Sequence, residues 1–364
     1  MSEERMAEVA GVDGTGWDVV VVGGGAAGLS AALTLARVRR SVLVVDSGEP
    51  RNAPAERTGV HGLLGREGVS PLELLRTGRA EVASYGGRVV AGRVTRIVRD
   101  GDGFDVRAEG ARVRARRLLV ATGLVDELPD VPGLAERWGR DVHHCVYCHG
   151  WEVRDTAIGV LGAFHQALMF RQMSDDVTLF RDPGTELSDA QWEQLAGLGV
   201  AVVDGPVAGL RIDGEDRLSG VRLASGPVVP VRHLAVMPYL AARASFLDGL
   251  GLALRDHPMG VGRQLAVDAA GFTGVPGIWA AGNVSDLVAN VAAAAAAGVA
   301  AAAAITMDLV TAGAERAAAG RARPRTAADD AVFGPASEAE VARRVLGTAA
   351  HGLHLPPPAA APDA

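Results

Sequence analysis

Short runs of β-branched and other apolar residues recur along the chain, and several end in a cluster of small residues. Residues 17–22 form such a run and lead directly into a Gly/Ala segment at 23–28, after which residues 29–37 show the apolar spacing of a helix. A second run at 42–45 ends in Asp46. The pattern predicts strand, glycine turn, helix and parallel strand, the βαβ unit of a doubly wound α/β domain.

The Gly/Ala segment has the spacing of a dinucleotide-binding turn. Gly23 suits the tight turn, Gly25 lets the backbone approach a pyrophosphate, and Gly28 lets the helix pack closely on the strand. Ala27 lies in the same segment, and Asp46 is placed to reach a ribose hydroxyl. These residues predict a dinucleotide site, the alternative being a glycine-rich turn without a ligand.

Two later segments repeat the junction of a strand with small residues. Residues 117–120 run into Thr122 and Gly123, and residues 277–281 run into Gly282 and Asn283. Backbone without bulky side chains can lie against a cofactor, so we expect both junctions to line the first site.

An Ala-rich segment at 289–305 follows the second junction. It has the length of a membrane span, but Ala is too weakly hydrophobic to make a convincing one. We therefore expect a close-packed interior helix and no association with a membrane.

Residues 157–180 carry an altered second copy of the nucleotide pattern. A strand at 157–161 is followed by Gly162, but Phe164 occupies the place of the middle glycine. We expect the phenyl ring to block a pyrophosphate, and the next strand ends in Arg181–Asp182–Pro183, not in several Arg suited to a 2′-phosphate. The alternative is that NADPH still binds through another loop conformation.

Composition and net charge exclude some classes of protein. The 364 residues are 48% hydrophobic and carry a net charge of −7, which predicts a folded protein of more than one domain without a surface for nucleic acid. The first residues are polar and acidic and unlike a secretory signal, so we expect a cytoplasmic protein.

Both cysteines of the chain lie in one short segment rich in histidine, His143–His144–Cys145–Val146–Tyr147–Cys148–His149. A Cys-x-x-Cys pair with neighbouring imidazoles suits thiol–disulfide exchange, because a histidine can stabilise a thiolate or relay its proton. His149 is the first candidate for the general base and His144 the second, and either could instead be structural. The alternative is a zinc site, but the sequence has no second Cys-x-x-Cys or spaced His pair to complete it, so we expect no metal.

The order of these motifs resembles the low-molecular-weight thioredoxin reductase family over about residues 16 to 312. The resemblance implies FAD as the cofactor, a homodimer, and an FAD domain split by the domain that carries the cysteines. It also places His61 and Gly62 where family members line the flavin.

The sequence departs from those reductases at His149, where they carry Asp, and in the missing glycine and Arg motifs for NADPH. In these respects it is similar to the dithiol oxidases of gliotoxin- and holomycin-type pathways. That similarity implies a small-molecule dithiol as substrate, O2 as electron acceptor and hydrogen peroxide as product. It also implies that Cys148 is the sulfur next to the flavin and that Cys145 exchanges with substrate.

The expected fold is α/β, with two Rossmann-like, three-layer domains. We expect an FAD-binding domain at 1–126 and 238–312, a degenerate NADPH-type domain at 127–237, and a C-terminal extension at 313–364. In the extension, Ser337 and Glu340 suggest a capping box that opens one amphipathic helix.

Two other functions remain open from the sequence. The first is an NADPH-dependent thioredoxin or disulfide reductase, in which electrons flow the opposite way. The second is a flavoprotein sensor whose cysteine pair reports redox state without turnover.

Overall fold

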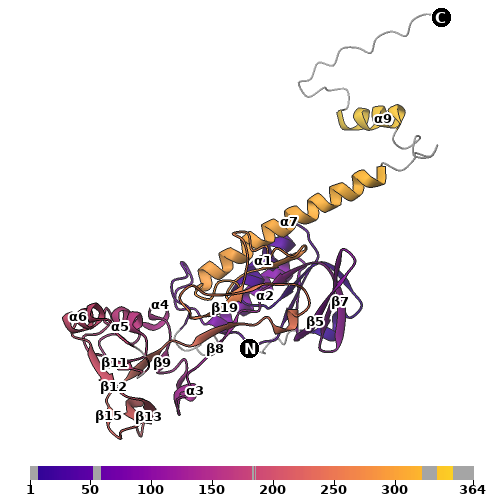
Figure 1. Cartoon of the computed structure of the whole chain (residues 1–364). Coiled ribbons are helices and arrows are strands. Elements are labelled where there is room, and N and C mark those ends of the chain that lie inside the picture. The colour runs from indigo at the N-terminus through magenta and orange to yellow at the C-terminus, as the bar shows by residue number, and fades with distance from the viewer. Residues whose placement is uncertain (1–6, 52–58, 183, 185, 322–333, 347–364) are drawn as a thin grey trace, which may run out of the picture. The chain divides into compact units, whose positions relative to one another are not determined.

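The computed structural model describes residues 7–51, 59–182, 184, 186–321 and 334–346 (Figure 1). The chain separates into two compact units, residues 1–306 and 307–364, and the candidate site lies in the first. Residues 313–321, which we expected to belong to the extension, continue helix α7 (Val291–Arg321).

The first sheet has eight strands among the described residues, in the order β1-β4-β3-β2-β7-β6-β5, with β20 paired to β7. Strands β2, β3, β4, β7 and β20 run parallel, whereas β5, β6 and β7 form an antiparallel meander. The strands are β1 (Ala7–Glu8), β2 (Gly16–Val22), β3 (Val42–Asp46), β4 (Arg88–Ala91), β5 (Val94–Asp100), β6 (Gly103–Ala108), β7 (Ala111–Val120) and β20 (Ile278–Ala280).

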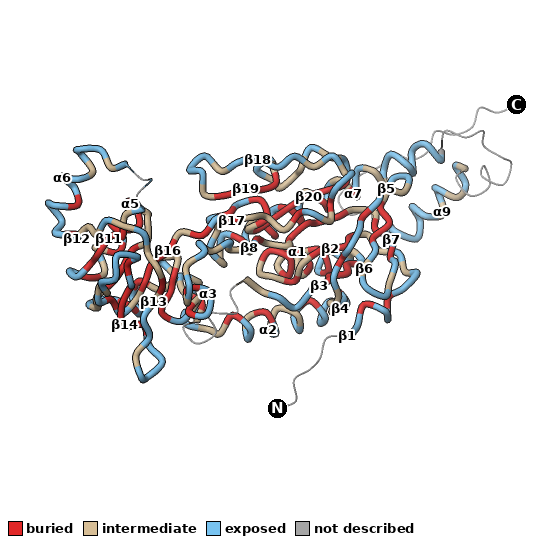
Figure 2. The backbone as a smooth tube through the Cα atoms, turned by 60° about the horizontal axis from the view of Figure 1, so that its bottom comes forward, coloured by how far each residue is buried: buried red, intermediate tan, exposed pale blue. Residues whose placement is uncertain are grey.

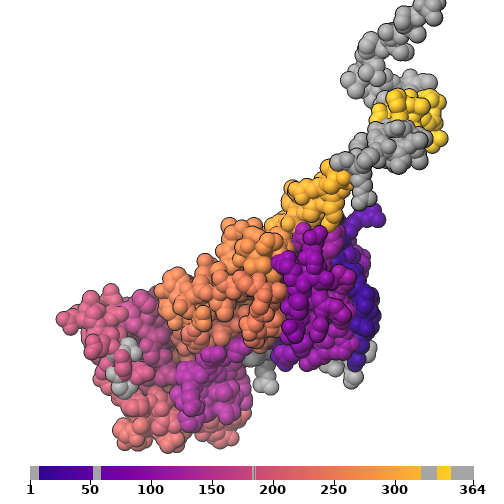
Figure 3. Space-filling view, turned by 45° about the vertical axis from the view of Figure 1, so that its right-hand side comes forward, coloured from indigo at the N-terminus to yellow at the C-terminus, as the bar shows by residue number. Residues whose placement is uncertain are grey.

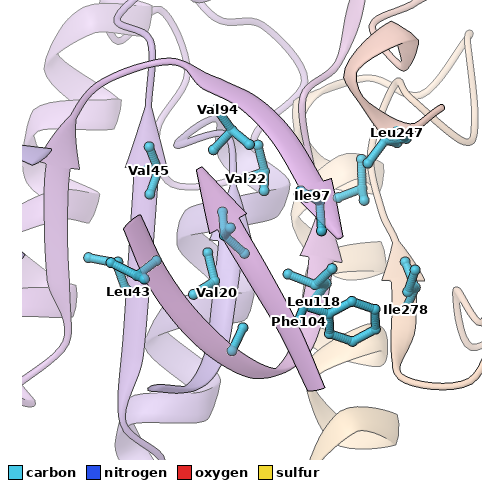
Figure 4. Packing of buried hydrophobic residues seen from close by; sticks show 14 of the residues in the cluster. Val20, Val22, Leu43, Val45, Val94, Ile97, Phe104, Leu118, Leu247 and Ile278 are labelled. Carbon is cyan, nitrogen blue, oxygen red and sulfur yellow. The ribbon is translucent and has the colours of Figure 1, made fainter. Parts of the chain in front are cut away.

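The centre of this sheet is buried on both faces, as expected for parallel strands covered by helices and a second layer. All five residues of β3 are buried, and Val20, Leu43, Leu118 and Ile278 have no exposed surface. Figure 4 shows these side chains packed with Phe104 of the meander. The continuous apolar runs seen in the sequence are therefore the strands of this core.

Strand β20 returns to the sheet from the C-terminal half of the chain. It pairs in parallel with β7 through Ile278, opposite Leu118, and Ala280, opposite Val120. Figure 3 shows the orange segment that contains β20 lying directly against the purple N-terminal segment. One sheet is thus built from two distant parts of the chain, in agreement with the expected split fold, while the residue boundaries of the domains stay predictions.

A second, fully parallel sheet has the order β12-β11-β10-β16-β9 and lies between the two parts of the first in sequence. Figure 2 shows its strands as largely buried and its peripheral loops as exposed. Its strands are β9 (Val142–His143), β10 (Ile158–Leu161), β11 (Val177–Arg181), β12 (Ala201–Asp204) and β16 (His233–Val236).

Two smaller sheets complete this unit. The sheet β13-β14-β15 is an antiparallel meander, and the sheet β18-β19-β17-β8 contains β8 and β17, which lie on either side of the second sheet in sequence. Their strands are β13 (Val207–Ile212), β14 (Leu218–Leu223), β15 (Val228–Val229), β8 (Leu124–Glu127), β17 (Tyr239–Ala242), β18 (Leu254–Asp256) and β19 (Gly262–Leu265).

The helices follow the predicted βαβ order. Helix α1 begins directly after the glycine turn that follows β2, and α5 directly after the turn that follows β10. The helices of the described chain, with two 3-10 turns, are η1 (Val9–Val12), α1 (Ala26–Arg37), α2 (Pro71–Ser84), α3 (Leu134–Arg137), α4 (Val146–His149), α5 (Phe164–Phe170), α6 (Asp189–Gly197), η3 (Ser245–Leu247), α7 (Val291–Arg321) and α9 (Pro335–Leu346).

By length and composition, helix α7 could cross a membrane, and 33% of its most apolar stretch of 18 residues is buried within the protein. Ala301, Ala302 and Ile305 are fully buried, whereas Val299 on the other side is 46% exposed. The prediction of an interior helix is therefore confirmed for one face and wrong for the other, because Ala is small enough to pack closely yet costs little when it remains exposed.

Helix α9 begins two residues before the expected start. The structure starts it at Pro335, a residue favoured in the first turn because its missing N–H is not needed there, so Ser337 is inside the helix. Glu340 pairs with Arg343 at 2.7 Å and with Arg344 at 2.8 Å, and does not serve as the capping partner. The capping-box prediction is wrong for this reason.

A buried ion pair stabilises the second sheet. Arg137 donates to Asp141 from Nε at 2.7 Å and from Nη2 at 2.5 Å, and Asp141 also accepts the Leu218 N–H. Burial alone would raise the pKa of Asp141, but the hydrogen bonds from Arg137 and Leu218 hold it below its ordinary value.

We predict that Asp141→Asn lowers the free energy of unfolding by about 3 kcal/mol, because it leaves the buried Arg137 charge with only the exposed Asp216 carboxylate as an ionic partner. Urea unfolding measures the effect. Asp216→Asn is the matched control, since the Asp216 side chain also pairs with Arg137 but is 67% exposed, and it should cost less than about 1 kcal/mol. Because the pKa of Asp141 is lowered on folding, its contribution is present above about pH 4 and is lost as the pH falls. Equal effects of the two variants would contradict this assignment.

Candidate functional site

The glycine turn between β2 and α1 has the geometry of a dinucleotide site. Gly23 has a φ of +105°, which favours glycine, and a Cβ at Gly28 would collide with the carbonyl oxygen of Gly23. Gly25, the N-cap of α1, has open space in place of protein atoms within 4 Å of its Cβ position. The turn therefore has bare backbone and a helix N-terminus where FAD would place its pyrophosphate.

Two segments from the C-terminal half meet this turn at Ala27. A Cβ at Gly282 would lie 2.8 Å from the Ala27 Cβ, and one at Gly298 would collide with the Ala27 backbone. Gly282 thus lies next to the first glycine turn, and α7 packs on α1 at the same place, while the contact of Gly282 with FAD stays a prediction.

Asp46 ends β3 beside the turn. Its carboxylate accepts the Gly48 N–H and forms an ion pair with Arg79, both at 3.3 Å, and a Cβ at Gly24 would lie 2.7 Å from its Oδ2. The position fits the predicted contact with a ribose hydroxyl. The sequence reading did not foresee Arg79.

The other predicted cofactor residues have partners within the protein. The hydroxyl of Thr122 donates to the Arg243 carbonyl at 2.7 Å, next to Gly123, which has a φ of +69°. The side-chain amide of Asn283 donates to the carbonyls of Asp286, at 3.0 Å, and Ala289, at 2.9 Å. These hydrogen bonds hold the two loops in shape, and the contact of Thr122, Gly123 and Asn283 with FAD stays a prediction.

The structure corrects one prediction about the second nucleotide pattern, the position of the Phe164 ring. The ring of Phe164 is only 9% exposed and packs in the core with Ile158, Ala167 and Leu179. The expectation that this ring stands in the path of a pyrophosphate is wrong, because an apolar ring is more stable in the core. Two features still disfavour NADPH at this pattern. The middle glycine is missing, and Arg181 is already paired with Asp204 at 2.5 Å.

The two cysteines lie at the start of α4, which follows the edge strand β9. Cys145 is the N-cap of this one-turn helix and Cys148 lies within it, and both are half-buried free thiols. A hydrogen bond from the Cys148 thiol, with the backbone N–H groups of Cys148 and Tyr147, lowers the pKa of Cys145 to about 7, although burial opposes this. The same hydrogen bond, together with burial, raises the pKa of Cys148. Cys145 is therefore the thiolate of the reduced pair.

The two candidate bases have different surroundings. Burial and then the Arg51 charge lower the pKa of His144 to about 4, which makes it a poor proton acceptor at neutral pH. Burial also lowers the pKa of His149, but Glu152 opposes the shift, while His61 adds to it. Both ring nitrogens of His149 are buried without a partner among the described residues. These orphaned nitrogens fit a site whose missing partner is a bound cofactor or substrate.

His61 connects the loop at residues 59–70 with the cysteine segment. Its Nδ1 lies 2.6 Å from Glu67 and its Nε2 3.6 Å from Glu152, while the Gly62 N–H donates to Glu67 at 2.9 Å. The structure thus brings the predicted His61 and Gly62 toward His149, through Glu152.

Two further residues belong to this site that the sequence reading missed. Arg51 is held by two hydrogen bonds to Asp126, at 2.8 and 2.7 Å, and its charge lowers the pKa of both cysteines. Gln166 is buried in α5 and donates to the His144 carbonyl at 2.6 Å, which ties the cysteine segment to the second sheet. No local pattern marks them, because each acts on residues distant in sequence.

Metal binding finds no support in the described residues. They contain no group of three or more His, Cys, Asp or Glu side chains arranged to hold a metal ion. His143 and His149 stack on each other, and His143 is hydrogen-bonded to His233.

We predict that Gly25→Ala and Gly28→Ala act differently. Gly25→Ala should leave the melting temperature of the apoprotein within a few degrees of wild type but weaken FAD binding, because its Cβ points into the open space. Gly28→Ala should destabilise the apoprotein itself by about 2 kcal/mol or more, since its Cβ meets backbone that cannot move freely. Thermal unfolding without FAD and flavin retention on gel filtration measure the two effects. Equal melting temperatures for the two variants would contradict this reading.

We also predict that iodoacetamide alkylates Cys145 in the reduced protein with a midpoint near the pKa of about 7. Cys148→Ala should move this midpoint upward, because it removes the thiol that stabilises the Cys145 thiolate. Mass spectrometry of the alkylated peptide over a pH series gives the midpoint. A midpoint unchanged by Cys148→Ala would show that the thiol hydrogen bond is not the cause.

Comparisons with known proteins agree with this geometry. Residues 17–298 match the family described as pyridine nucleotide-disulphide oxidoreductase. Thioredoxin reductase tcpT of Claviceps purpurea is 32% identical over 298 residues, which cover 75% of this chain and 88% of tcpT. Thioredoxin reductase sirT of Leptosphaeria maculans is 29% identical over 288 residues, covering 73% of this chain and 86% of sirT.

A solved structure shows the same likeness in three dimensions. The crystal structure of HlmI is 45% identical to this chain with a TM-score of 0.77, and the match covers 87% of this chain and 99% of HlmI. FAD is the cofactor of this fold, and the glycine turn fits it. The chain is a thioredoxin reductase-like, flavin-dependent member of the pyridine nucleotide-disulphide oxidoreductase family.

Proposed function

We propose that this flavin-dependent disulfide oxidoreductase is a dithiol oxidase, which closes an intramolecular disulfide in a small-molecule dithiol. The observation that carries the proposal is the Cys145–Cys148 pair, with its thiolate at a helix start near His149, whose ring nitrogens have no hydrogen-bond partner among the described residues. The second nucleotide pattern has Phe164 for glycine and an occupied Arg181, which favours a dithiol over NADPH as electron donor.

The proposed reaction begins with the cysteine pair as a disulfide. One substrate thiolate attacks Cys145, the Cys145–Cys148 bond breaks, and Cys148 leaves as the thiolate. The second substrate thiol, after losing its proton, attacks the substrate sulfur bound to Cys145. The substrate disulfide forms, and Cys145 leaves. A sulfur with a pKa of about 7 leaves readily, which supports Cys145 as the exchanging sulfur.

The remaining residues assist through charge and proton transfer. Arg51 favours the thiolate form of both cysteines. His149 is the proposed acceptor of the substrate thiol proton, because its ring is neutral near pH 7 and its nitrogens are unpartnered. FAD held at the glycine turn of residues 23–28 would supply the acceptor for the two electrons of the cysteine pair, with O2 as the final acceptor and hydrogen peroxide as the product.

The proposal includes the setting of the enzyme. We propose a cytoplasmic homodimer that takes a dithiol of a natural-product pathway and O2, with no nucleic acid or membrane partner. The resemblance of the motifs to dithiol oxidases supports the dithiol and O2, and the resemblance to thioredoxin reductases supports the homodimer. The names of the curated relatives favour the alternative, an NADPH-dependent thioredoxin reductase.

The test uses the holoenzyme with dithiothreitol as the probe dithiol. In air we expect oxygen uptake with one hydrogen peroxide per dithiol oxidised, and Cys145→Ser or Cys148→Ser should lower the rate by about 100-fold or more. Under anaerobic conditions, dithiothreitol should bleach the flavin, and an equal concentration of NADPH should not.

Bleaching by stoichiometric NADPH, with no peroxide from dithiothreitol, would overturn the proposal in favour of the reductase. Tyr147→Phe is the matched control, since Tyr147 lies between the cysteines with its side chain exposed and forms no part of the proposed chemistry. It should keep the wild-type rate and flavin content.

A further inference from the structure

His143 is a buried histidine that the proposed reaction does not use. It ends β9, is only 4% exposed, and its Nδ1 has no partner among the described residues. Its ring lies flat against the ring of His149, with centroids 4.6 Å apart and planes inclined by 28°. One face of the proposed base is therefore covered by a second imidazole.

His233 holds the His143 ring from the neighbouring strand. Strands β9 and β16 are parallel with His143 opposite Ala235, so His233, two residues earlier on β16, projects on the same face. The Nε2 of His143 lies 3.3 Å from the Nδ1 of His233, with one nitrogen donating and the other accepting. The ring that covers His149 is thus fixed by the sheet.

We propose that His143 is a positioning residue for His149, whose flat, buried ring fixes the plane of the base and shields one face of it from water. This inference rests on the proposed function only in giving His149 the role of proton acceptor. The stack itself is a property of the folded chain.

The neutrality of the buried His143 ring explains why an imidazole can stack on His149. Burial, followed by the nearby His149 and His233, lowers the pKa of His143 to about 3, so the ring is neutral at physiological pH. A neutral ring does not repel the proton that His149 accepts, and it packs as an aromatic surface. A residue with only a packing role would ordinarily have its buried nitrogens satisfied, whereas Nδ1 of His143 and both nitrogens of His149 are not.

The charged and titratable groups around His149 set the sign of the expected pH effects. Glu152 raises its pKa, whereas burial and His61 lower it, and His143 and His233 lie behind the stacked face. Removing the His143 ring admits water, which weakens the effect of burial, so the pKa of His149 should rise. Removing the Glu152 charge should lower it further.

The experiment compares three variants of the holoenzyme. His143→Phe keeps the flat ring, His143→Leu keeps apolar bulk without a plane, and His143→Ala removes both. Titration of histidine-labelled protein by NMR, with His149→Gln to assign the signal, gives the pKa of His149. The pH dependence of kcat for dithiothreitol gives its effect on turnover.

We expect His143→Phe to retain the low pKa of His149 and most of kcat. His143→Leu should keep the low pKa but lower kcat about 10-fold with little change in KM, because the base is no longer held in plane. His143→Ala should raise the pKa of His149 and move the acid limb of the kcat profile to higher pH. Glu152→Gln is the control of opposite sign in the NMR titration.

The inference would be overturned if His149 had the same pKa in all three variants and if kcat were equal for His143→Phe and His143→Leu. His143 would then have only a packing role. If His143→Ala does not fold, the comparison of kcat between His143→Phe and His143→Leu still tests the inference. The NMR titration needs no turnover, so wild-type enzyme that does not oxidise dithiothreitol would refute the proposed function and leave the stack to be judged separately.

Discussion

Close contact of bare backbone around Ala27 is the constraint on which the rest of this structure depends. Gly28 lies against the Gly23 carbonyl, and Gly298 lies against the Ala27 backbone. A side chain at either glycine would push the first helix away from its strand or from α7. The first contact is local and shapes a turn that can accept a pyrophosphate, whereas the second joins α7 to α1 from a distant part of the chain, in the same half that returns β20 to the first sheet.

The redox site depends on a different kind of constraint. The cysteine segment has one helical turn, too short to be stable alone, so neighbouring elements must hold it. The second sheet does so through Gln166, which donates to the His144 carbonyl, and the loop of His61 approaches it through Glu152. Burial of several imidazoles in one place keeps them neutral, while the Cys148 thiol and, to a smaller extent, the Arg51 charge lower the pKa of Cys145.

The altered second nucleotide pattern shows how one substitution affects packing and function together. Phe164 occupies a glycine position, yet its ring turns into the core beside Ile158 and Leu179. The domain therefore gains apolar burial and loses the bare backbone of a phosphate site. Gln166, two residues further along α5, reaches the cysteine segment. The helix that follows the altered turn thus helps to hold the redox pair in place.

The sequence by itself determined the features that depend on neighbouring residues: the strand and helix around Gly23 to Gly28, the pairing of Cys145 with Cys148, and the α/β class. Local spacing is enough for these, because a strand, a turn and a short helix are set within a few residues. It did not determine the direction of the Phe164 ring, the start of α9, the charge from Arg51 or the stack of His143 on His149. Only the tertiary structure decided these, because each depends on which distant side chains share a buried space, and burial changes both the packing and the pKa of every group within it.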